Sequence, residues 1–204
     1  MTGYDMLVVG GVGVDTAVRV RELPVEVRDS IGVPPIRDYP GHTGNGVALG
    51  CHALGLITKF IDVIGDDPQG HMILDHYARR GLDFSYLVHP SGTRRSVNLV
   101  DKAGRRMSFY DGRHPMDLRI SREFYWPFLE QARHVHLSIM NFARYLYEDV
   151  HRLGRTVSTD LHDWDGEADY HRDFAYGSVV TSLIASPSPA NPLPQRDRSV
   201  SGTN

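Results

Sequence analysis

The sequence predicts an α/β fold built on a mainly parallel sheet, and three observations carry this prediction. Residues 6–9 form a short, entirely apolar run, which is typical of a strand covered on both faces. Residues 41–70 combine a glycine-rich loop, a helix and a strand in one unit. Strand, helix and strand patterns then follow one another at 134–139, 142–153 and 156–161. That order implies a crossover connection and therefore parallel strands.

The composition fits one globular domain and excludes several classes of protein. The chain has 204 residues, of which 41% are apolar, and its net charge of -3 gives no reason to expect nucleic acid or an anionic membrane as a partner. The single Cys51 excludes an internal disulfide framework and fits a cytoplasmic location. The N-terminus lacks a basic segment followed by an apolar one, and no run reaches the length of a membrane span.

The unit at 41–70 opens with a glycine-rich loop at 40–46. Glycine tolerates positive φ and lets a ligand approach the backbone closely, so this loop is a candidate binding element. Residues 47–54 are nearly all apolar or small and predict a helix buried on most sides, with Gly55 as its C-terminal cap. Residues 59–64 predict a short buried strand.

A second helix is predicted at 71–80. Asp67 is a favourable N-cap residue, Pro68 suits the first helical position and Gly81 suits the C-terminal cap. Apolar residues recur at helical spacing along one side of this segment, which predicts that the helix packs against the sheet and has no chemical role.

A β-hairpin is predicted where residues 96–100 and 107–110 alternate in polarity around a turn at 101–104. Four arginines flank it: Arg94, Arg95, Arg105 and Arg106. Charged residues at strand ends usually solvate an edge and protect it from pairing, and we interpret these four in that way. A phosphate-binding role for one of them stays open.

The region 41–70 resembles the first signature of the PfkB (ribokinase-like) carbohydrate kinases. In that family a Gly-Gly pair is followed by Asn, small residues, Leu-Gly, a strand and Gly-x-Asp-x-x-Gly. The matching residues here are Gly41, Asn45, Ala48, Leu54, Gly55, Gly65, Asp67 and Gly70. Two departures are that Pro40 replaces the first glycine and that the spacing from Asn45 to Gly55 is one residue longer. The resemblance implies a ribokinase-like three-layer sandwich with a small β lid at about 94–112, truncated at the C-terminus.

The resemblance also implies a reaction, the ATP-dependent phosphorylation of a sugar hydroxyl, with Mg2+ neutralising the phosphates. In this family an aspartate soon after the first strand binds sugar hydroxyls, and Asp15 occupies that place. A carboxylate can accept hydrogen bonds from two vicinal hydroxyls, and the alternative role for Asp15 is to cap a turn. Gly41, Gly44 and Asn45 are also expected at the sugar. The lid of such kinases often pairs with a second subunit, so a homodimer through the lid is expected.

Two further candidates for the substrate site lie at the carboxyl ends of predicted strands, where open α/β sheets bind their ligands. Asn141 follows the strand at 134–139, and Asp160 lies at the end of the strand at 156–161. The family also has a strand that ends in aspartate at a corresponding stage, which adds to the case for Asp160.

No catalytic residue can be assigned on the family pattern. A Gly-Ala-Gly-Asp-type segment supplies the phosphoryl-stabilising backbone and the base in these kinases, and this sequence contains no Gly-x-Gly-Asp. The resemblance covers about residues 7–177, and residues 178–204 predict an aberrant strand followed by a disordered Ser/Pro-rich tail. We therefore expect a sugar-binding N-terminal portion at 1–177, a frameshift or truncation near Gly177, and little or no kinase activity from this chain alone. ATP and Mg2+ are expected for the family, and their binding is not assigned to this chain.

The residues suggest three alternative interpretations. The segment 162–166, with His171 nearby, invites a metal-binding interpretation, but its spacing matches no justified ligand set and a polar loop is the better prediction. A non-catalytic module that binds a sugar or dimerises through the lid stays open. A nucleotide-dependent oxidoreductase would rest on the glycines at 10–13, although a dinucleotide fingerprint needs a third glycine where Thr16 stands.

Overall fold

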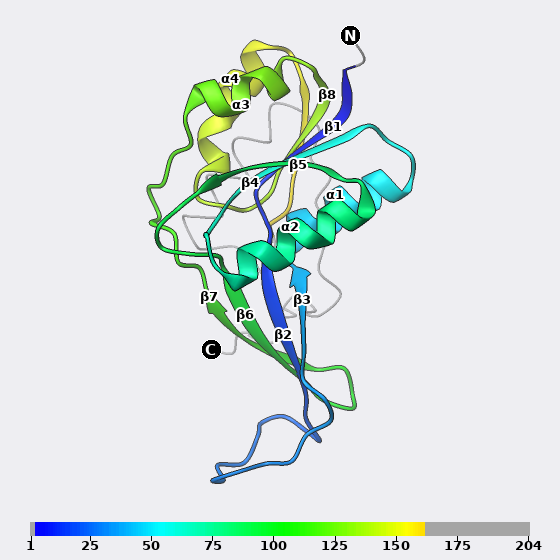
Figure 1. Cartoon of the computed structure of the whole chain (residues 1–204), viewed down its shortest axis with the longest axis vertical. Helices are drawn as coiled ribbons and strands as arrows, with labels where there is room; N and C mark the ends of the chain where they lie inside the picture. The colour runs from blue at the N-terminus through cyan, green and yellow to red at the C-terminus, as the bar shows by residue number, and fades with distance from the viewer. Residues whose placement is uncertain (1–2, 162–204) are drawn as a thin grey trace, which may run out of the picture.

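The computed structural model describes residues 3–161, which form a five-stranded sheet and a separate four-stranded sheet. All neighbouring strands of the five-stranded sheet are parallel. Their order is β5 (Asp83–Val88), β4 (Thr58–Ile64), β1 (Tyr4–Val9), β8 (Ala132–Leu137) and β9 (Thr156–Thr159). The predicted α/β class with a mainly parallel sheet is therefore confirmed (Figure 1).

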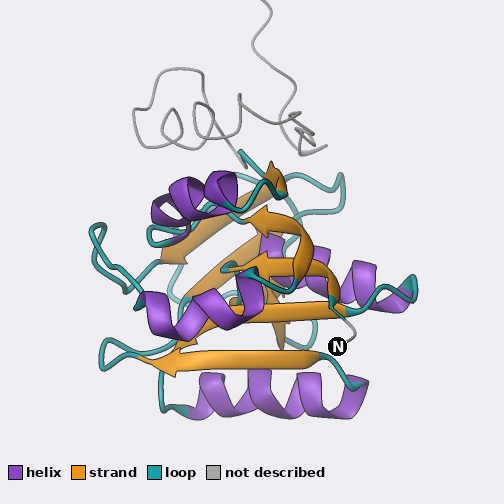
Figure 2. Cartoon of the chain, turned by 90° about the horizontal axis from the view of Figure 1, so that it is seen from above, coloured by secondary structure: helices purple, strands orange, loops and turns teal. Residues whose placement is uncertain are grey.

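Helices cover both faces of the parallel sheet and give the fold three layers (Figure 2). One layer contains α1 (Thr43–Ala53) and α2 (Pro68–Arg80), and the other contains α3 (Arg122–Leu129) and α4 (Tyr147–Arg152), the latter preceded by a 3-10 turn at Ala143–Leu146. Within residues 3–161, no helix is long and apolar enough to cross a membrane.

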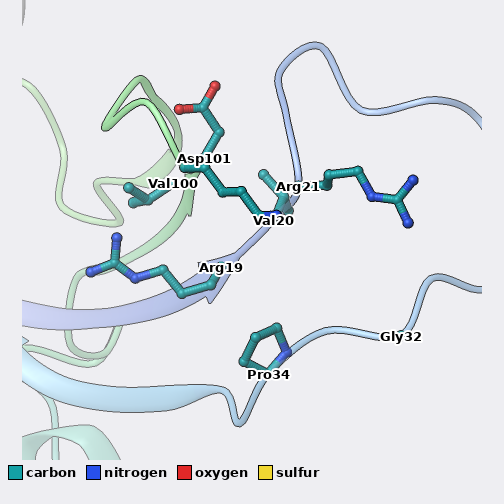
Figure 3. Close-up of a pocket in the computed structure, with 8 residues that line it drawn as sticks. Arg19, Val20, Arg21, Gly32, Pro34, Val100 and Asp101 are labelled. Atoms are coloured by element: carbon teal, nitrogen blue, oxygen red, sulfur yellow. The ribbon is translucent and has the colours of Figure 1, made fainter.

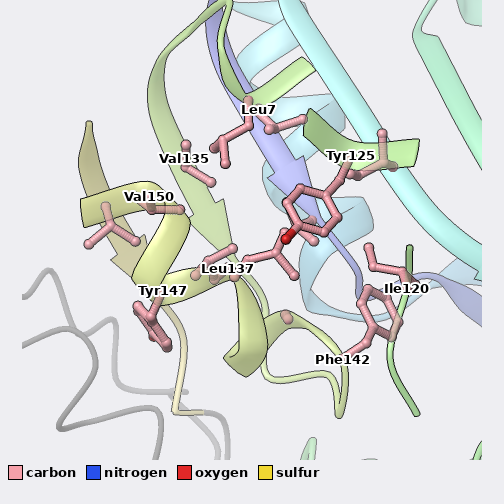
Figure 4. Close-up of a cluster of buried hydrophobic side chains, with 14 of the residues drawn as sticks. Leu7, Ile120, Tyr125, Val135, Leu137, Phe142, Tyr147 and Val150 are labelled. Atoms are coloured by element: carbon pink, nitrogen blue, oxygen red, sulfur yellow. The ribbon is translucent and has the colours of Figure 1, made fainter. Parts of the chain in front are cut away.

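Two hydrophobic cores lie on the two sides of the sheet. Successive strand side chains point to opposite faces, so β1 sends Leu7 and Val9 into the core under α3 and α4, and Val8 into the core under α1 and α2. Figure 4 shows Leu7 among the side chains of the first of these cores, which Tyr125 and Phe142 help to fill. Each fully buried aliphatic side chain contributes roughly 1.5–3 kcal/mol, which explains the uninterrupted apolar run in β1.

The four-stranded sheet continues from the carboxyl end of β1 and forms the lid (Figure 1). Its order is β3 (Arg37–Gly41), β2 (Gly13–Arg19), β6 (Arg95–Val100) and β7 (Arg106–Asp111). The antiparallel pair of β6 and β7 confirms the predicted hairpin. β2 pairs with β3 in antiparallel and with β6 in parallel orientation, so the lid sheet is larger than the hairpin that the sequence predicted.

The register of the lid sheet separates its side chains into two faces. Asp15 is the partner of both Tyr39 and Ser96, and Ser96 is the partner of Tyr110, so these four side chains share one face. We call it the inner face, and by the same register it also carries Ala17, Arg19, Arg37, Asn98, Val100, Arg106 and Ser108. The opposite, outer face carries Thr16, Val18, Asp38, Val97, Leu99, Met107 and Phe109. The inner face is polar and aromatic, and the outer face is mostly apolar.

Helix α1 differs from the prediction in its start and in its burial. Gly44 and Asn45 lie in its first turn and not in a loop. The helix is not buried on most sides, because its buried residues are only Gly44, Asn45 and Ala48, and Leu54 beyond its end is largely exposed. A narrow stripe of small residues packs against the sheet, and composition alone does not distinguish such a stripe from full burial. Gly55 follows with a φ of 85°, as expected near a helix C-terminus.

The start of α2 confirms the predicted capping. Asp67 is the N-cap residue, and its Oδ1 accepts a hydrogen bond of 2.8 Å from Gly70 N. Thr93 donates to the same carboxylate twice, from its N at 2.7 Å and from its Oγ1 at 2.7 Å. Asp67 therefore ties α2 to the segment that enters lid strand β6.

Replacing Asp67 with alanine is expected to lower the free energy of unfolding by about 1–2 kcal/mol, since the cap is lost. Burial raises the pKa of Asp67, but hydrogen bonds from Thr93 and Gly70 outweigh it and hold that pKa below its usual value. Because the pKa of Asp67 is lower in the folded protein than in the unfolded chain, its contribution to the free energy of unfolding is complete above the pKa of the unfolded chain. That contribution is lost as the pH falls through the pKa of the folded protein. Urea denaturation at neutral and at acidic pH measures both effects.

The matched control for this prediction is Ser121→Ala. Ser121 is the N-cap residue of α3 but makes no capping hydrogen bond, so its replacement should change stability little. Equal losses for the two variants, or a loss at Asp67 that persists unchanged at acidic pH, would contradict the assigned role.

Candidate functional site

The candidate site forms where β1 passes into β2, at the junction of the two sheets. Gly10 and Gly11 lie there with φ of 79° and 93°, in the left-handed region that favours glycine. A Cβ on Gly44 would lie 1.9 Å from the Gly10 carbonyl oxygen, so only glycine lets α1 begin against this junction. Asn45 N also donates to Gly11 O at 2.9 Å. The close approach that Gly44 permits in this structure is therefore to the Gly10 backbone.

The strand that follows these glycines speaks against the oxidoreductase alternative. A dinucleotide fingerprint requires a helix to open directly after its glycines, because the helix N-terminus holds the pyrophosphate. Here the chain enters β2, which is a strand of the lid sheet and not a helix.

Asp15 lies within β2 on the inner face and therefore does not cap a turn. Gly41 lies beside it, and a Cβ on Gly41 would lie 2.2 Å from Asp15 Oδ2, so glycine at this position leaves the space that the carboxylate occupies. His42 Nε2 lies 3.1 Å from Asp15 Oδ1 and 3.2 Å from Ser96 Oγ. The fold thus brings two of the predicted site residues, Asp15 and Gly41, into contact.

Aromatic side chains flank Asp15, and the sequence had not indicated them. Tyr39 and Tyr110 lie on the two edge strands of the lid in the same row as Asp15, and they are 43% and 59% exposed. The Tyr110 ring centroid is 5.7 Å from that of His42, whose φ of 73° turns the chain from β3 into α1. Only the strand register reveals that these rings share a face with the carboxylate.

Asn45 is buried, and both ends of its side chain have partners. Its Nδ2 donates to Pro40 O at 3.2 Å, and its Oδ1 accepts a hydrogen bond of 2.7 Å from the Tyr77 hydroxyl. These contacts join α1 to β3 and α2. They favour a role for Asn45 in positioning the Gly41 segment beside Asp15.

Asp160 follows β9 and belongs to a polar chain at the carboxyl end of the parallel sheet. Ser138 Oγ donates its only hydrogen to Asp160 Oδ2 at 2.9 Å. In the 2.8 Å hydrogen bond between Thr43 Oγ1 and Ser138 Oγ, the threonine is therefore the donor. His136 Nε2 lies 3.5 Å from the same carboxylate. Burial raises the pKa of Asp160, but His136 and the Ser138 hydroxyl bring it below its usual value. Asp160 is thus an anion that is linked to the first residue of α1.

Asn141 lies after β8, and its contacts are with the segment that leaves the lid. Its Nδ2 donates to His114 O at 3.3 Å and to Pro115 O at 2.7 Å. The described contacts do not join it to Asp15. Asn141 therefore holds the exit of the lid against the end of the parallel sheet.

Arg94 corrects the interpretation of the lid arginines as solvated edge charges. Its side chain and that of Asp62 are 2% and 0% exposed, and Arg94 Nη2 donates to Asp62 Oδ1 at 2.6 Å. Arg94 also donates to Val12 O at 3.0 Å and, through Nη1, to His114 Nδ1 at 3.1 Å. Burial and the neighbouring Arg94 charge lower the pKa of His114 to about 4, so its ring is neutral and accepts this bond. One guanidinium therefore fastens three segments at the junction of the sheets.

The side chains of the described part form no magnesium site of their own. Among residues 3–161, no group of three or more His, Cys, Asp or Glu side chains could hold a metal ion, so we derive no step through a protein-bound metal. The segment at 162–166, His171 and the tail at 178–204 lie outside the described residues.

A parallel sheet between two helix layers, with a β lid at its carboxyl end, defines the ribokinase-like class of folds. The structure of Arabidopsis thaliana ribokinase complexed with ribose and ATP matches with a TM-score of 0.62 at 20% identity, over 80% of this chain and 55% of that chain. At this identity the match shows the fold alone.

The pfkB family carbohydrate kinase profile matches residues 6–152, and the chain belongs to this family. It is 42% identical over 183 residues to the acarbose 7(IV)-phosphotransferase of Actinoplanes sp., which is 89% of this chain and 61% of that protein. It matches the structure of the microbiome-derived acarbose kinase Mak1 at 57% identity and a TM-score of 0.81, over 87% of this chain and 59% of that chain. The chain spans about three fifths of the length of these two relatives. The resemblance seen in the sequence is confirmed.

Proposed function

We propose that this chain is the sugar-binding part of a carbohydrate kinase that transfers a phosphoryl group from ATP to a sugar hydroxyl. The observation that supports the proposal most directly is the setting of Asp15. Its carboxylate lies on the inner face of the lid, beside Gly41 and His42 and between two tyrosines. The names of the two similar relatives make acarbose our first candidate substrate.

The described residues bind and orient the sugar. The Asp15 carboxylate accepts hydrogen bonds from two vicinal hydroxyls, and His42 lies beside the carboxylate. Asn45 fixes the Gly41 segment, while Asp160 and Asn141 hold the adjoining ends of α1 and the lid and stay candidates for contact with the substrate. ATP, with Mg2+ on its phosphates, supplies the phosphoryl group when bound. Fixing the acceptor hydroxyl is the contribution we assign to this part of the protein.

The proposal is tested by replacing Asp15 with asparagine and titrating acarbose into the wild-type and variant chains by calorimetry. Asparagine keeps the shape but loses the charged acceptor, and hydrogen bonds to charged groups contribute about 1.5–3 kcal/mol, so the affinity should fall about tenfold or more. Asp38→Asn is the matched control, because Asp38 lies on the outer face of the same sheet. Equal affinities for wild type and Asp15→Asn would refute the proposed site.

The second candidate function is a non-catalytic module that binds a sugar and dimerises through the lid. The apolar outer face supports pairing with a second copy, because Met107 and Phe109 are exposed there. Incubation with ATP, Mg2+ and acarbose, followed by mass spectrometry, tests this second candidate: phosphorylated acarbose would exclude a non-catalytic module, whereas its absence agrees with both candidates because little activity is expected from this chain alone. For either candidate we expect a cytoplasmic location, where the free thiol of Cys51 stays reduced.

A further inference from the structure

His42 has a backbone conformation that its residue type disfavours. Its φ of 73° and ψ of 167° lie in a region that glycine occupies almost alone, and residues strained in this way cluster at functional sites. His42 is also the N-cap residue of α1, but its side chain makes no capping hydrogen bond. Glycine would therefore fit the backbone better at this position. The benefit of a histidine here lies in the contacts of its ring.

The ring occupies a space that the lid sheet leaves for it. The His42 side chain is only 9% exposed. A Cβ on Gly13 would collide with the His42 ring and with the Arg94 carbonyl oxygen, so glycine in β2 makes room for the imidazole. The Tyr110 ring of β7 packs against it, with 5.7 Å between the ring centroids. The lid therefore holds the imidazole in one place beside Asp15.

The Asp15 carboxylate lacks the donors that a largely buried anion needs. Among the described residues, its Oδ1 is buried and has no hydrogen-bond partner. His42 Nε2 lies 3.1 Å from this oxygen, within ion-pair distance, but its hydrogen bond of 3.2 Å is with Ser96 Oγ. The contact between His42 and Asp15 is thus one of charge, and it becomes an ion pair when the imidazole is protonated.

The arginines of the inner face do not supply this charge. No arginine within residues 3–161 forms an ion pair with Asp15. Arg19 is four residues further along β2, about 13 Å at a rise of about 3.3 Å per residue, and exposed charges at that separation are largely screened by salt. It lines a half-open cavity of about 390 Å³ together with Gly32 and Pro34 of the loop before β3 (Figure 3). The positive charge next to Asp15 therefore comes from the imidazole.

The other charged or titratable groups around this pair keep one protonation state near neutral pH. Besides Asp15, these groups are Tyr39, Asp62, Arg94, Tyr110 and Asp160. Burial raises the pKa of both tyrosines, so their hydroxyls stay protonated. Arg94 and Asp62 form an ion pair with each other, and hydrogen bonds that outweigh its burial keep the pKa of Asp160 below its usual value. Imidazole is the side chain that normally changes its charge between pH 5 and 8, which makes His42 the titrating member of this group.

We propose that His42 is the counterion of Asp15 in the sugar-bound site, and that sugar binding is coupled to the uptake of one proton from the solvent by His42. A sugar at Asp15 displaces water from the pair. Attraction between opposite charges grows as water is removed, whereas a carboxylate without a counterion becomes more unfavourable to bury. The hydroxyls supply the donors that Asp15 lacks, and the imidazolium balances its charge. This inference rests on the proposed function and adds a positioning residue to it.

The test is a calorimetric titration of acarbose into the full chain near pH 7, in two buffers that differ in enthalpy of ionisation. The difference in the heat of binding gives the number of protons taken up, which should lie between zero and one. The affinity should fall about threefold to tenfold from pH 6 to pH 8, because the protonated form binds more tightly. In His42→Gln, which cannot titrate, both effects should disappear. His71→Gln is the matched control and should keep both, because His71 pairs with Asp66 at 3.3 Å on the exposed surface at α2.

The outcomes separate this inference from the proposed function. Binding of acarbose without proton uptake, or with proton release, would overturn the inference but leave a sugar site at Asp15 intact. Uptake that persists in His42→Gln would also overturn it, in favour of another histidine such as His136. The wild-type titration needs no variant, so it tests the inference even if His42→Gln fails to fold. No binding of acarbose by the wild type would overturn both proposals.

Discussion

Replacing Asp62 with alanine is expected to lower the free energy of unfolding by about 3–5 kcal/mol, because it leaves the Arg94 guanidinium buried without a counterion. The Asp62 carboxylate also accepts a hydrogen bond of 2.7 Å from Val12 N, which would be left without its acceptor. Since Val12 and Arg94 both lie at the junction of the two sheets, the loss should reach the lid. Urea denaturation gives the stability, and hydrogen exchange in β6 reports the lid separately.

A surface pair provides the control for this prediction. Asp111 and Arg113 are joined at 2.8 Å, a distance similar to that of the buried pair, but Asp111 is 53% exposed. Asp111→Ala should therefore lower the free energy of unfolding by less than about 1 kcal/mol. The double variant Asp62→Leu, Arg94→Met should recover much of the stability, because it removes both charges together. If Asp62→Ala lowered the free energy of unfolding as little as Asp111→Ala, water would have to reach the buried pair.

Replacing Phe109 with aspartate is expected to convert a dimer of this chain into monomers. Phe109 is 58% exposed on the outer face, and Val97, Leu99 and Met107 surround it in register. A second copy that covered this face would bury Phe109, and a buried carboxylate without a partner is strongly unfavourable. Sedimentation velocity over a range of concentrations measures the change.

The neighbouring Tyr110 is a closely matched control for dimerisation. It is 59% exposed and adjacent to Phe109, but it lies on the inner face. Tyr110→Asp should therefore leave the association unchanged. A wild-type chain that stays monomeric at every concentration, or equal dissociation of both variants, would rule out pairing through the outer face.

The parallel sheet could be predicted largely from residue patterns, because its central strands are covered on both faces. The apolar runs in β1 and β4 are strong signals of this kind. β5 was not predicted, since an edge strand with partly exposed side chains produces no such run. The addition of β2 and β3 to the lid also could not be predicted, because the pairing of strands distant in sequence depends on the assembled fold.

The candidate site could be predicted only where a local motif marks it. Asp15 and Gly41 follow from the resemblance, and the structure brings them together. Tyr39 and Tyr110 escaped prediction because they join the site through register and not through spacing in the chain. Arg94 was interpreted as a solvated charge because its counterion, Asp62, lies 32 residues away in the sequence.

The two-faced lid restricts how its length can change during evolution. Because side chains alternate along a strand, inserting or deleting one residue in β6 would exchange the faces of every residue beyond that point. Ser96 and Asn98 would then lie on the outer face, while Val97 and Leu99 would lie on the inner face. Single substitutions alter one face at a time, but a single-residue insertion alters both together. We therefore expect natural length variation in this lid to fall in its connecting loops, or to occur within its strands in steps of two residues.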